Sequence, residues 1–423
     1  MAASKTNIHI SANPSRVDEA VEIHISGAPT NTWITIQAVM KDNLGSDWES
    51  FAEVLTDDSG YCDLSAQTPR TGTYACQDAM GLIWSMQWKS NDQALRTPLA
   101  PIHTKLRVLA KGETLTEAIW IRYPLSPNVT RIPVRENGLV GALYVPKEGG
   151  PYPAIVMLGG SEGGLRSSNA SLLSAHGFAV LALAYFGIGE LQEQLMHIPL
   201  EYFYKAIEWL QKHDDVASEK LAFIGTSRGG ELALLCGSFF HEIKAVVGIV
   251  PSSVVVRGIG AAPEDQIPYA WTWRGKGLPY LNTLPPSDIR EEIVRQRKAG
   301  EQVRLRDSFL SQLQLADEET IEKVAIPVHN IQGNVLIISG GDDQMWPSTV
   351  YGERIIRHLE RHNHPHEYLH LNYPHAGHMI HAPFYPTTKR DGNYLLGGSP
   401  QADAQAQAKA WHEIIQFLNR SLL

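Results

Sequence analysis

The sequence predicts two folded parts, an all-β part followed by a larger α/β part. In the first part, residues 21–25 and 33–39 alternate between apolar and polar side chains. Such period-two runs, separated by turn residues, are typical of a β-sandwich. From residue 131 onward, apolar runs alternate with helical patterns, which is typical of a mostly parallel sheet with helices on both faces. We therefore expect one domain over residues 1–126 and a second over 127–423.

The first domain is expected to be an immunoglobulin-like β-sandwich. An aromatic-rich run at residues 80–88 is interpreted as a strand whose rings fill the core. Residues 105–110 are interpreted as another strand, and residues 123–128 as the linker to the second domain. No internal repeat and no low-complexity tract interrupts this organisation.

A β-hairpin is expected to open the second domain. Residues 131–135 and 139–145 flank the dipeptide Asn137-Gly138, which favours a tight hairpin turn. Further strands are expected at 154–158, 178–185, 221–224, 245–250, 335–339 and 366–371. Amphipathic patterns predict helices at 201–210 and 402–419.

Residues 256–330 do not fit the alternation of strands and helices. They separate two expected strands and are too many for a simple crossover. The segment contains one clear helical pattern at 287–299, with Ser287 as the expected N-cap and Gly300 after the end. We expect a cap-like insertion over the carboxyl edge of the sheet, where α/β sheets bind ligands.

The composition limits the class of protein. The 423 residues are 43% hydrophobic and 19% charged, as in a globular protein with a substantial core. A net charge of -9 gives no electrostatic footprint for nucleic acid. No apolar run reaches the roughly 18 residues that a membrane span needs. The polar N-terminus resembles no signal peptide, and three cysteines make no disulfide framework, so a soluble cytoplasmic protein is expected.

A short motif points to nucleophilic catalysis. The sequence Gly-Thr-Ser-Arg-Gly at 225–229 follows the apolar strand at 221–224 and precedes a helix rich in Ala and Leu. In this context Gly-x-Ser-x-Gly is the nucleophile elbow of α/β-hydrolases, which would present the Ser227 hydroxyl on a strained turn above the sheet. The two glycines are needed because a Cβ would crowd the turn. The alternative is a helix N-cap serine with incidental glycines.

A nucleophilic serine needs a base and an acid that orients the base. In α/β-hydrolases the acid and then the histidine follow the serine along the chain. The loop after the 335–339 strand offers Asp342 and Asp343, and the residue pattern does not choose between them. The loop after the last strand offers His378, which follows a glycine, with His375 as its competitor. The order and the positions after strands predict a Ser–Asp–His triad.

An oxyanion hole is expected beside the nucleophile. One donor would be the backbone N–H of Arg228, and the other would come from the glycine-rich loop at 159–164. Within that loop, Gly160 or Ser161 is the expected donor. The alternative is a phosphate-cradling loop, but neither G-x-x-x-x-G-K-[ST] nor G-x-G-x-x-G is present there.

No metal site is expected from the sequence. The histidines at 362, 364, 366 and 370 show no H-E-x-x-H pattern and have no partner cysteines. We interpret them as part of a polar loop leading into the last strand.

Several stretches together carry a resemblance to a known family. They are 72–74, 80–84, 199–203, 225–231, 341–346, 373–374, 377–378 and 397–400. Along nearly all its length the chain resembles the acyl-CoA thioesterases of type I and the bile acid-CoA:amino acid N-acyltransferases. The resemblance implies a β-sandwich before an α/β-hydrolase domain and a triad of Ser227, Asp343 and His378. The transferases of the family have Cys where this chain has Ser.

The resemblance also implies an activity. We expect an acyl-CoA thioesterase of lipid and fatty acid metabolism, which hydrolyses an acyl-CoA thioester to free acid and CoA through an acyl-enzyme. The alternatives are an acyl-CoA-dependent N- or O-acyltransferase, and a carboxylesterase or peptidase with the same triad. No cofactor is expected, because CoA is part of the substrate. The expected partner is a small acyl-CoA or ester, and a homo-oligomer is left open.

Substrate contacts are expected from the insertion. Its aromatic residues Trp271, Trp273 and Tyr280 could line an acyl or adenine pocket or pack in the core. Its basic residues could hold the phosphates of CoA or form solvated helix faces. They are Arg257, Arg274, Lys276, Arg290, Arg295, Arg297, Lys298, Arg304 and Arg306.

Overall fold

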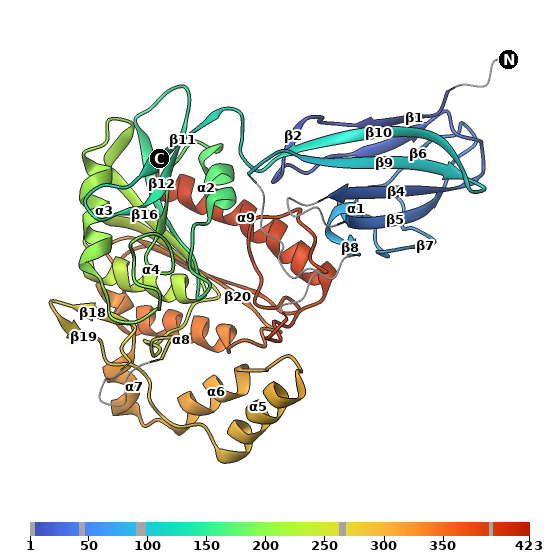
Figure 1. Ribbon diagram of the computed structural model, residues 1–423. Coiled ribbons are helices and arrows are strands. Elements are labelled where there is room, and N and C mark those ends of the chain that lie inside the picture. Colours follow the sequence, from blue (N-terminus) through green and yellow to red (C-terminus); the bar gives the residue numbers. More distant parts are fainter. Residues whose placement is uncertain (1–4, 42–46, 90–98, 262–267, 389–391) are drawn as a thin grey trace. The chain divides into compact units, whose positions relative to one another are not determined.

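The computed structural model of the chain (Figure 1) describes residues 5–41, 47–89, 99–261, 268–388 and 392–423. Parts of the expected sandwich and residues 262–267 of the expected insertion lie outside the described residues. The chain divides into two compact units. The first comprises Met1–Pro127, Ala382–Arg390 and Ser399–Ala408, and the second comprises Asn128–His381, Asp391–Gly398 and Lys409–Leu423.

The first unit is built from two β-sheets. Its strands are β1 (Asn7–Ile10), β2 (Ser15–Arg16), β3 (Ile23–Ser26), β4 (Trp33–Lys41), β5 (Asp47–Leu55), β6 (Cys62–Asp63), β7 (Thr71–Gly72), β8 (Gln87–Trp88), β9 (Ile102–Ala110) and β10 (Glu113–Tyr123). One sheet has the order β1-β3-β6, and the other has the order β2-β10-β9-β4-β5-β7 with β8 paired to β5. Every second side chain of β4 and β9 is buried, as the alternating sequence predicts for a sandwich.

The aromatic-rich run at 80–88 is not the single strand that was predicted. It forms the short helix α1 (Gly81–Trp84), and only Gln87–Trp88 is a strand. Asp78 explains the helix, because its carboxylate accepts the backbone N–H of Met80 and the indole N–H of Trp84, both at 2.8 Å. All four helix residues are buried, so the run has no polar face and its apolar pattern does not separate strand from helix.

Two segments near the C-terminus belong to the first unit, whereas the division at residue 126 assigned them to the second. The fully buried Arg122 donates a hydrogen bond of 2.7 Å to the backbone carbonyl of Phe384. Thr387 donates its backbone N–H to the carbonyl of Trp84 at 3.0 Å. These bonds join residues far apart in the sequence, so local patterns could not reveal them.

The second unit is centred on an eight-stranded sheet with the order β11-β12-β14-β13-β16-β17-β20-β21. The strands are β11 (Val129–Val134), β12 (Val140–Pro146), β13 (Tyr152–Leu158), β14 (Ala179–Ala184), β16 (Val216–Thr226), β17 (Ile243–Ile249), β20 (Asn334–Gly340) and β21 (Tyr368–Tyr373). The strands from β14 to β21 in this order are parallel to one another, whereas β12 is antiparallel to both β11 and β14. The expected hairpin is confirmed, with positive φ angles of 55° at Asn137 and 76° at Gly138.

Helices α2 (Ser167–Ser174), α3 (Glu201–Gln211), α4 (Arg228–Phe239) and α8 (Ser348–Arg361) pack against this sheet (Figure 1). The 3-10 helix η1 (Val328–Asn330) packs against α4 and α8, and the last helix along the chain is α9 (Pro400–Leu422). In α3 the buried side chains Phe203, Ala206, Ile207 and Leu210 recur at helical spacing and form one apolar face. No helix in the described part of the chain is long and apolar enough to cross a membrane.

The insertion contains more structure than the sequence suggested. Helix α5 (Ser287–Ala299) has the predicted bounds, but Ser287 is its first residue and Pro286 occupies the N-cap position. Two further helices, α6 (Arg306–Leu315) and α7 (Glu318–Val324), follow it. The remaining strands are β15 (Ile198–Pro199), β18 (Trp271–Trp273) and β19 (Lys276–Gly277), which form a small separate sheet.

Candidate active site

Ser227 lies on the sharp turn between β16 and α4. Its backbone has φ 58° and ψ −121°, a strained conformation for a residue with a side chain. The Ser227 N–H donates to the carbonyl of Ile249 at 2.8 Å, and its carbonyl accepts from Glu231 at 3.0 Å. The turn is thus held from the neighbouring strand and from the first turn of the helix, which is the geometry of a nucleophile elbow.

Two glycines make this turn possible. A Cβ on Gly225 would lie 2.0 Å from the carbonyl oxygen of Gly229, and a Cβ on Gly229 would lie 2.2 Å from the carbonyl oxygen of Gly159. Both contacts are to backbone atoms, which cannot move aside as a flexible side chain can. The strand, the helix and the glycine-rich loop therefore approach one another more closely than any larger residue allows.

We expect Gly225→Ala to lower the free energy of unfolding by about 3 kcal/mol, because the new methyl group overpacks a rigid turn. Chemical denaturation measures this loss. Gly159→Ala is the control, since its Cβ would meet no atom closer than 3.5 Å apart from its chain neighbours. Equal stability of the Gly225→Ala variant and the unchanged protein would contradict this account of the turn.

The structure brings the three predicted side chains together. Nε2 of His378 lies 3.0 Å from Oγ of Ser227, and Nδ1 of His378 lies 2.8 Å from Oδ2 of Asp343. Asp343 is 1% exposed and His378 is 6% exposed. The imidazole therefore bridges the hydroxyl and a buried carboxylate, the arrangement in which a histidine can remove the hydroxyl proton.

The two competing residues lie elsewhere. Asp342 is exposed and accepts hydrogen bonds from the amide of Gln344 at 2.6 Å and from the backbone N–H of Gly398 at 2.9 Å. His375 is exposed on the loop that follows β21. The geometry thus identifies Asp343, and not Asp342, as the acid that contacts His378, a choice that the residue pattern alone leaves open.

The loop around Asp343 fixes both the acid and the base. Oδ1 of Asp343 accepts the backbone N–H groups of Met345 at 2.9 Å and Trp346 at 3.2 Å. The indole of Trp346 packs edge-on against the ring of His378, with centroids 5.8 Å apart. Its own N–H donates to the carbonyl of Val250 at 3.0 Å. The carboxylate and the imidazole are consequently held on two sides, which pre-organises the proton transfer.

The residues predicted to donate to the oxyanion differ in their hydrogen bonds and in their surroundings. Arg228 is the first residue of α4, so its backbone N–H has no acceptor within the helix. Gly160 lies beside the nucleophile, because a Cβ on it would be 3.4 Å from Cβ of Ser227. Its N–H, however, donates to the carboxylate of Glu162 at 3.2 Å. Ser161 is exposed in the same loop.

Two residues that support the site were not singled out from the sequence. The buried Tyr185 at the end of β14 donates its hydroxyl to the carbonyl of Gly159 at 2.6 Å, which anchors the glycine-rich loop. Burial raises the pKa of this phenol, which therefore stays a donor. Glu231 forms a buried ion pair with Arg228, with Nη1 and Oε2 3.0 Å apart. A charged residue within the apolar helix α4 is the signal that could have pointed to Glu231.

The ion pair has further hydrogen-bond partners within the insertion. Glu231 also accepts from the indole of Trp271 at 2.8 Å and from the backbone N–H of Val256 at 3.2 Å. The guanidinium of Arg228 donates to the carbonyl of Val256 at 3.0 Å. Burial raises the pKa of Glu231, and the neighbouring Arg228 opposes that rise. The pair joins the start of α4 to the first residues of the insertion.

We expect Glu231→Gln to lower the free energy of unfolding by about 3 kcal/mol, because it leaves the Arg228 charge buried without its partner. The two side chains are 0% and 3% exposed, so water cannot compensate. Urea denaturation provides the measurement. Glu292→Gln, which breaks an exposed pair with Arg295, serves as the control and should leave the midpoint unchanged. A similar loss in both variants would refute the argument.

The aromatic and basic residues of the insertion differ in burial and in the partners that they contact. Trp271 is fully buried and belongs to the core, whereas Trp273 packs edge-on against Phe239 with centroids 5.3 Å apart. Of the basic residues, Arg295 is paired with Glu292 and Glu301. The remaining basic residues without an ion pair to another described residue are Arg257, Arg274, Lys276, Arg290, Arg297, Lys298 and Arg306.

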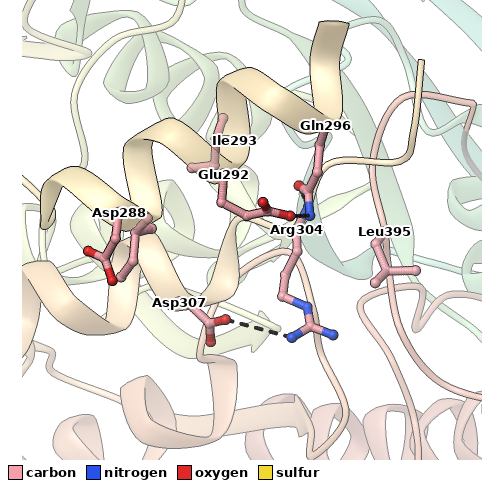
Figure 2. A pocket seen from close by; sticks show the side chains of 8 residues that line it. Asp288, Glu292, Ile293, Gln296, Arg304, Asp307 and Leu395 are labelled. Atoms are coloured by element: carbon pink, nitrogen blue, oxygen red, sulfur yellow. Dashed lines mark hydrogen bonds and ion pairs between the residues drawn. The ribbon is translucent and has the colours of Figure 1, made fainter. Parts of the chain in front are cut away.

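A cavity of about 330 Å³ lies between α5 and α6 (Figure 2). Among the described residues, its lining contains the carboxylates of Asp288, Glu292 and Asp307 but a single arginine, Arg304. That arginine is 3.7 Å from the carboxylate of Asp307, as the dashed line in Figure 2 marks. Three carboxylates against one cation make this cavity unsuited to the phosphates of CoA.

The sheet, the strained serine and the bridging histidine define the class of the second unit as an α/β-hydrolase with a serine-hydrolase active site. Residues 198–423 match the family model described as "BAAT / Acyl-CoA thioester hydrolase C terminal", and residues 18–136 match "Acyl-CoA thioester hydrolase/BAAT N-terminal region". The chain belongs to this acyl-CoA thioester hydrolase/BAAT family.

Similar proteins cover nearly the whole chain. Acyl-coenzyme A thioesterase 1 of Homo sapiens is 32% identical over 96% of this chain and 94% of its own length. Acyl-coenzyme A thioesterase 2, mitochondrial, of Mus musculus is 30% identical over 99% of this chain and 90% of its own length. Among solved structures, an esterase of Pyrobaculum calidifontis is 17% identical with a TM-score of 0.41, covering 70% of this chain and 86% of its own.

Proposed function

We propose that this protein is an acyl-CoA thioesterase, which hydrolyses an acyl-CoA thioester to the free acid and CoA. The observation that carries the proposal is the imidazole of His378, which lies 3.0 Å from the hydroxyl of Ser227 and 2.8 Å from the carboxylate of Asp343. The substrate class is supported by relatives that are named acyl-coenzyme A thioesterases.

In the first step His378 removes the hydroxyl proton while Ser227 attacks the thioester carbonyl carbon. The carbonyl oxygen becomes an oxyanion, for which the backbone N–H of Arg228 is the proposed donor together with one from the loop that holds Gly160 and Ser161. Removing one such donor typically costs about 3–4 kcal/mol of transition-state stabilisation. The tetrahedral intermediate then collapses, the C–S bond breaks, and His378 gives its proton to the departing sulfur, so that CoA leaves as the thiol and the imidazole is neutral again.

In the second step water completes the turnover. His378 removes a proton from a water molecule, which attacks the ester carbonyl of acylated Ser227. The C–Oγ bond then breaks, His378 returns the proton to the Ser227 oxygen, and the free acid leaves. An acyl-serine is an oxoester, which amines attack less readily than the thioester that a cysteine nucleophile would form. Ser227 therefore favours water over an amine as the acceptor of the acyl group.

A substrate panel tests this function. We expect thiol release from acyl-CoA to exceed release of acid from an oxoester with the same acyl chain, and we expect no cleavage of peptides. Adding amino acids or alcohols should leave free acid as the only acyl product in mass spectra. Faster oxoester or peptide turnover would replace the proposal with an esterase or peptidase, and acylated amines or alcohols would replace it with an acyltransferase.

We also propose that the enzyme works in the cytoplasm. The three cysteines Cys62, Cys76 and Cys236 are all free thiols, which fits a reducing compartment. Because some relatives are named mitochondrial, cell fractionation should score the protein against both cytosolic and mitochondrial markers. Recovery with the mitochondrial markers would contradict this location.

A further inference from the structure

Three histidines that are not part of the triad lie close together in the second unit. His329 lies in η1, His358 lies in the last turn of α8, and His362 follows directly after that helix. One ring nitrogen from each of them lies within 4.8 Å of the other two. His358 and His362 are four residues apart, so the helix itself places them on one face. The rings are stacked with centroids 4.3 to 4.9 Å apart.

The hydrogen bonds of these rings fix where their lone pairs lie. Nδ1 of His362 is 2.8 Å from the backbone carbonyl of His358, and a carbonyl only accepts, so this nitrogen carries the proton. The Nε2 atom of the neutral His362 ring then has a free lone pair. Nδ1 of His329 and Nε2 of His358 are 2.7 Å apart, so one of them carries a proton and the other a lone pair. An imidazole held by a carbonyl at one nitrogen is the usual state of a metal-ligating histidine.

The spacing of the nitrogens is close to that of a metal site. With metal–nitrogen bonds of about 2.0–2.1 Å, two ligands of a tetrahedral zinc ion are separated by roughly 3.3 Å. The pair at 2.7 Å would open slightly, and the third nitrogen, which lies within 4.8 Å of the other two, would approach by a small shift of the exposed His362 side chain that keeps its hydrogen bond to the carbonyl of His358. Three imidazoles without a carboxylate suit zinc or a similar transition metal and do not suit magnesium or calcium.

We propose that His329, His358 and His362 form a binding site for one divalent transition metal ion, with Zn²⁺ as the best match. The site would tie the C-terminal end of α8 to the segment that leads into β20. Helix α8 starts just after the Asp343 loop and carries His358 and His362 at its other end. The site is thus separated from the catalytic residues by most of a 14-residue helix, which spans about 20 Å. Its expected role is structural.

Zinc binding to the chelator-stripped, untagged full chain tests the site. In competition with a chromophoric zinc chelator at pH 7.5, we expect one ion per chain. His362→Gln should weaken the binding at least tenfold, and because His362 is exposed, the variant should fold normally. Zinc should also raise the Tm of the unchanged protein by a few degrees and have a smaller effect on the variant. His358→Gln should behave like His362→Gln.

The neighbouring His366 is the matched control. It is exposed and lies in the loop after α8, but it is not part of the cluster. His366→Gln should therefore bind zinc as the unchanged protein does. Absence of saturable binding would overturn the proposal, and so would equal affinities of the His362→Gln and His366→Gln variants.

Discussion

Ser227→Ala is expected to lower the rate of thiol release from acyl-CoA by roughly 10⁴- to 10⁶-fold, the loss seen when a triad nucleophile is removed. The hydroxyl of Ser227 lies 3.0 Å from Nε2 of His378, and alanine leaves the imidazole with no nucleophile to activate. Continuous detection of free thiol measures the effect.

Stability provides the control for this variant. Alanine takes the same strained backbone angles as serine at φ 58°, so the Tm should not change. Thiol release above one part in a hundred of the original rate, from a folded Ser227→Ala variant, would show that another residue is the nucleophile.

Asp343→Asn is expected to lower the rate of thiol release by about 10⁴-fold, as in serine proteases with the same change. Oδ1 of Asp343 accepts two backbone N–H groups, so the asparagine would keep its oxygen there. Its NH₂ group would then face Nδ1 of His378, which must become an acceptor. The proton of the neutral ring would move to Nε2, and the imidazole could no longer accept the proton of Ser227.

Asp342→Asn is the matched control, because it makes the same chemical change one residue away. Asp342 is exposed, and its carboxylate accepts from the amide of Gln344 and the N–H of Gly398. We expect thiol release within a few-fold of the original rate. A loss as large as that of Asp343→Asn would mean that the loop, and not the acid, is the sensitive element.

The sequence predicts the sheet well because its strands are buried on both faces. Strand β14 is a continuous apolar run, β17 is one from Ala245 onward, and the helices between them keep helical spacing. The nucleophile elbow is equally visible, since Gly225 is required by a backbone contact with Gly229, within a few residues of Ser227. Local physics decides both features.

Other features depend on contacts between distant residues. The residue pattern offers no reason to prefer Asp343 to Asp342, because the choice follows from the position of His378 in space. The role of Tyr185 depends on the glycine-rich loop, which is 26 residues away. The sequence places His362 beside the histidines at 364 and 366, whereas in the structure it lies beside His329 and His358.

The central claim is that Ser227 is the nucleophile that takes the acyl group from CoA. Its most direct test is active-site titration with a fluorophosphonate, which reacts covalently with activated serines. Peptide mapping then measures the fraction of Ser227 that is labelled, and the same samples are assayed for thiol release from acyl-CoA. We expect the label on Ser227, protection by acyl-CoA, and a loss of activity in proportion to labelling. Full thiol release from protein labelled at Ser227, or inactivation with the label on another residue, would contradict the claim.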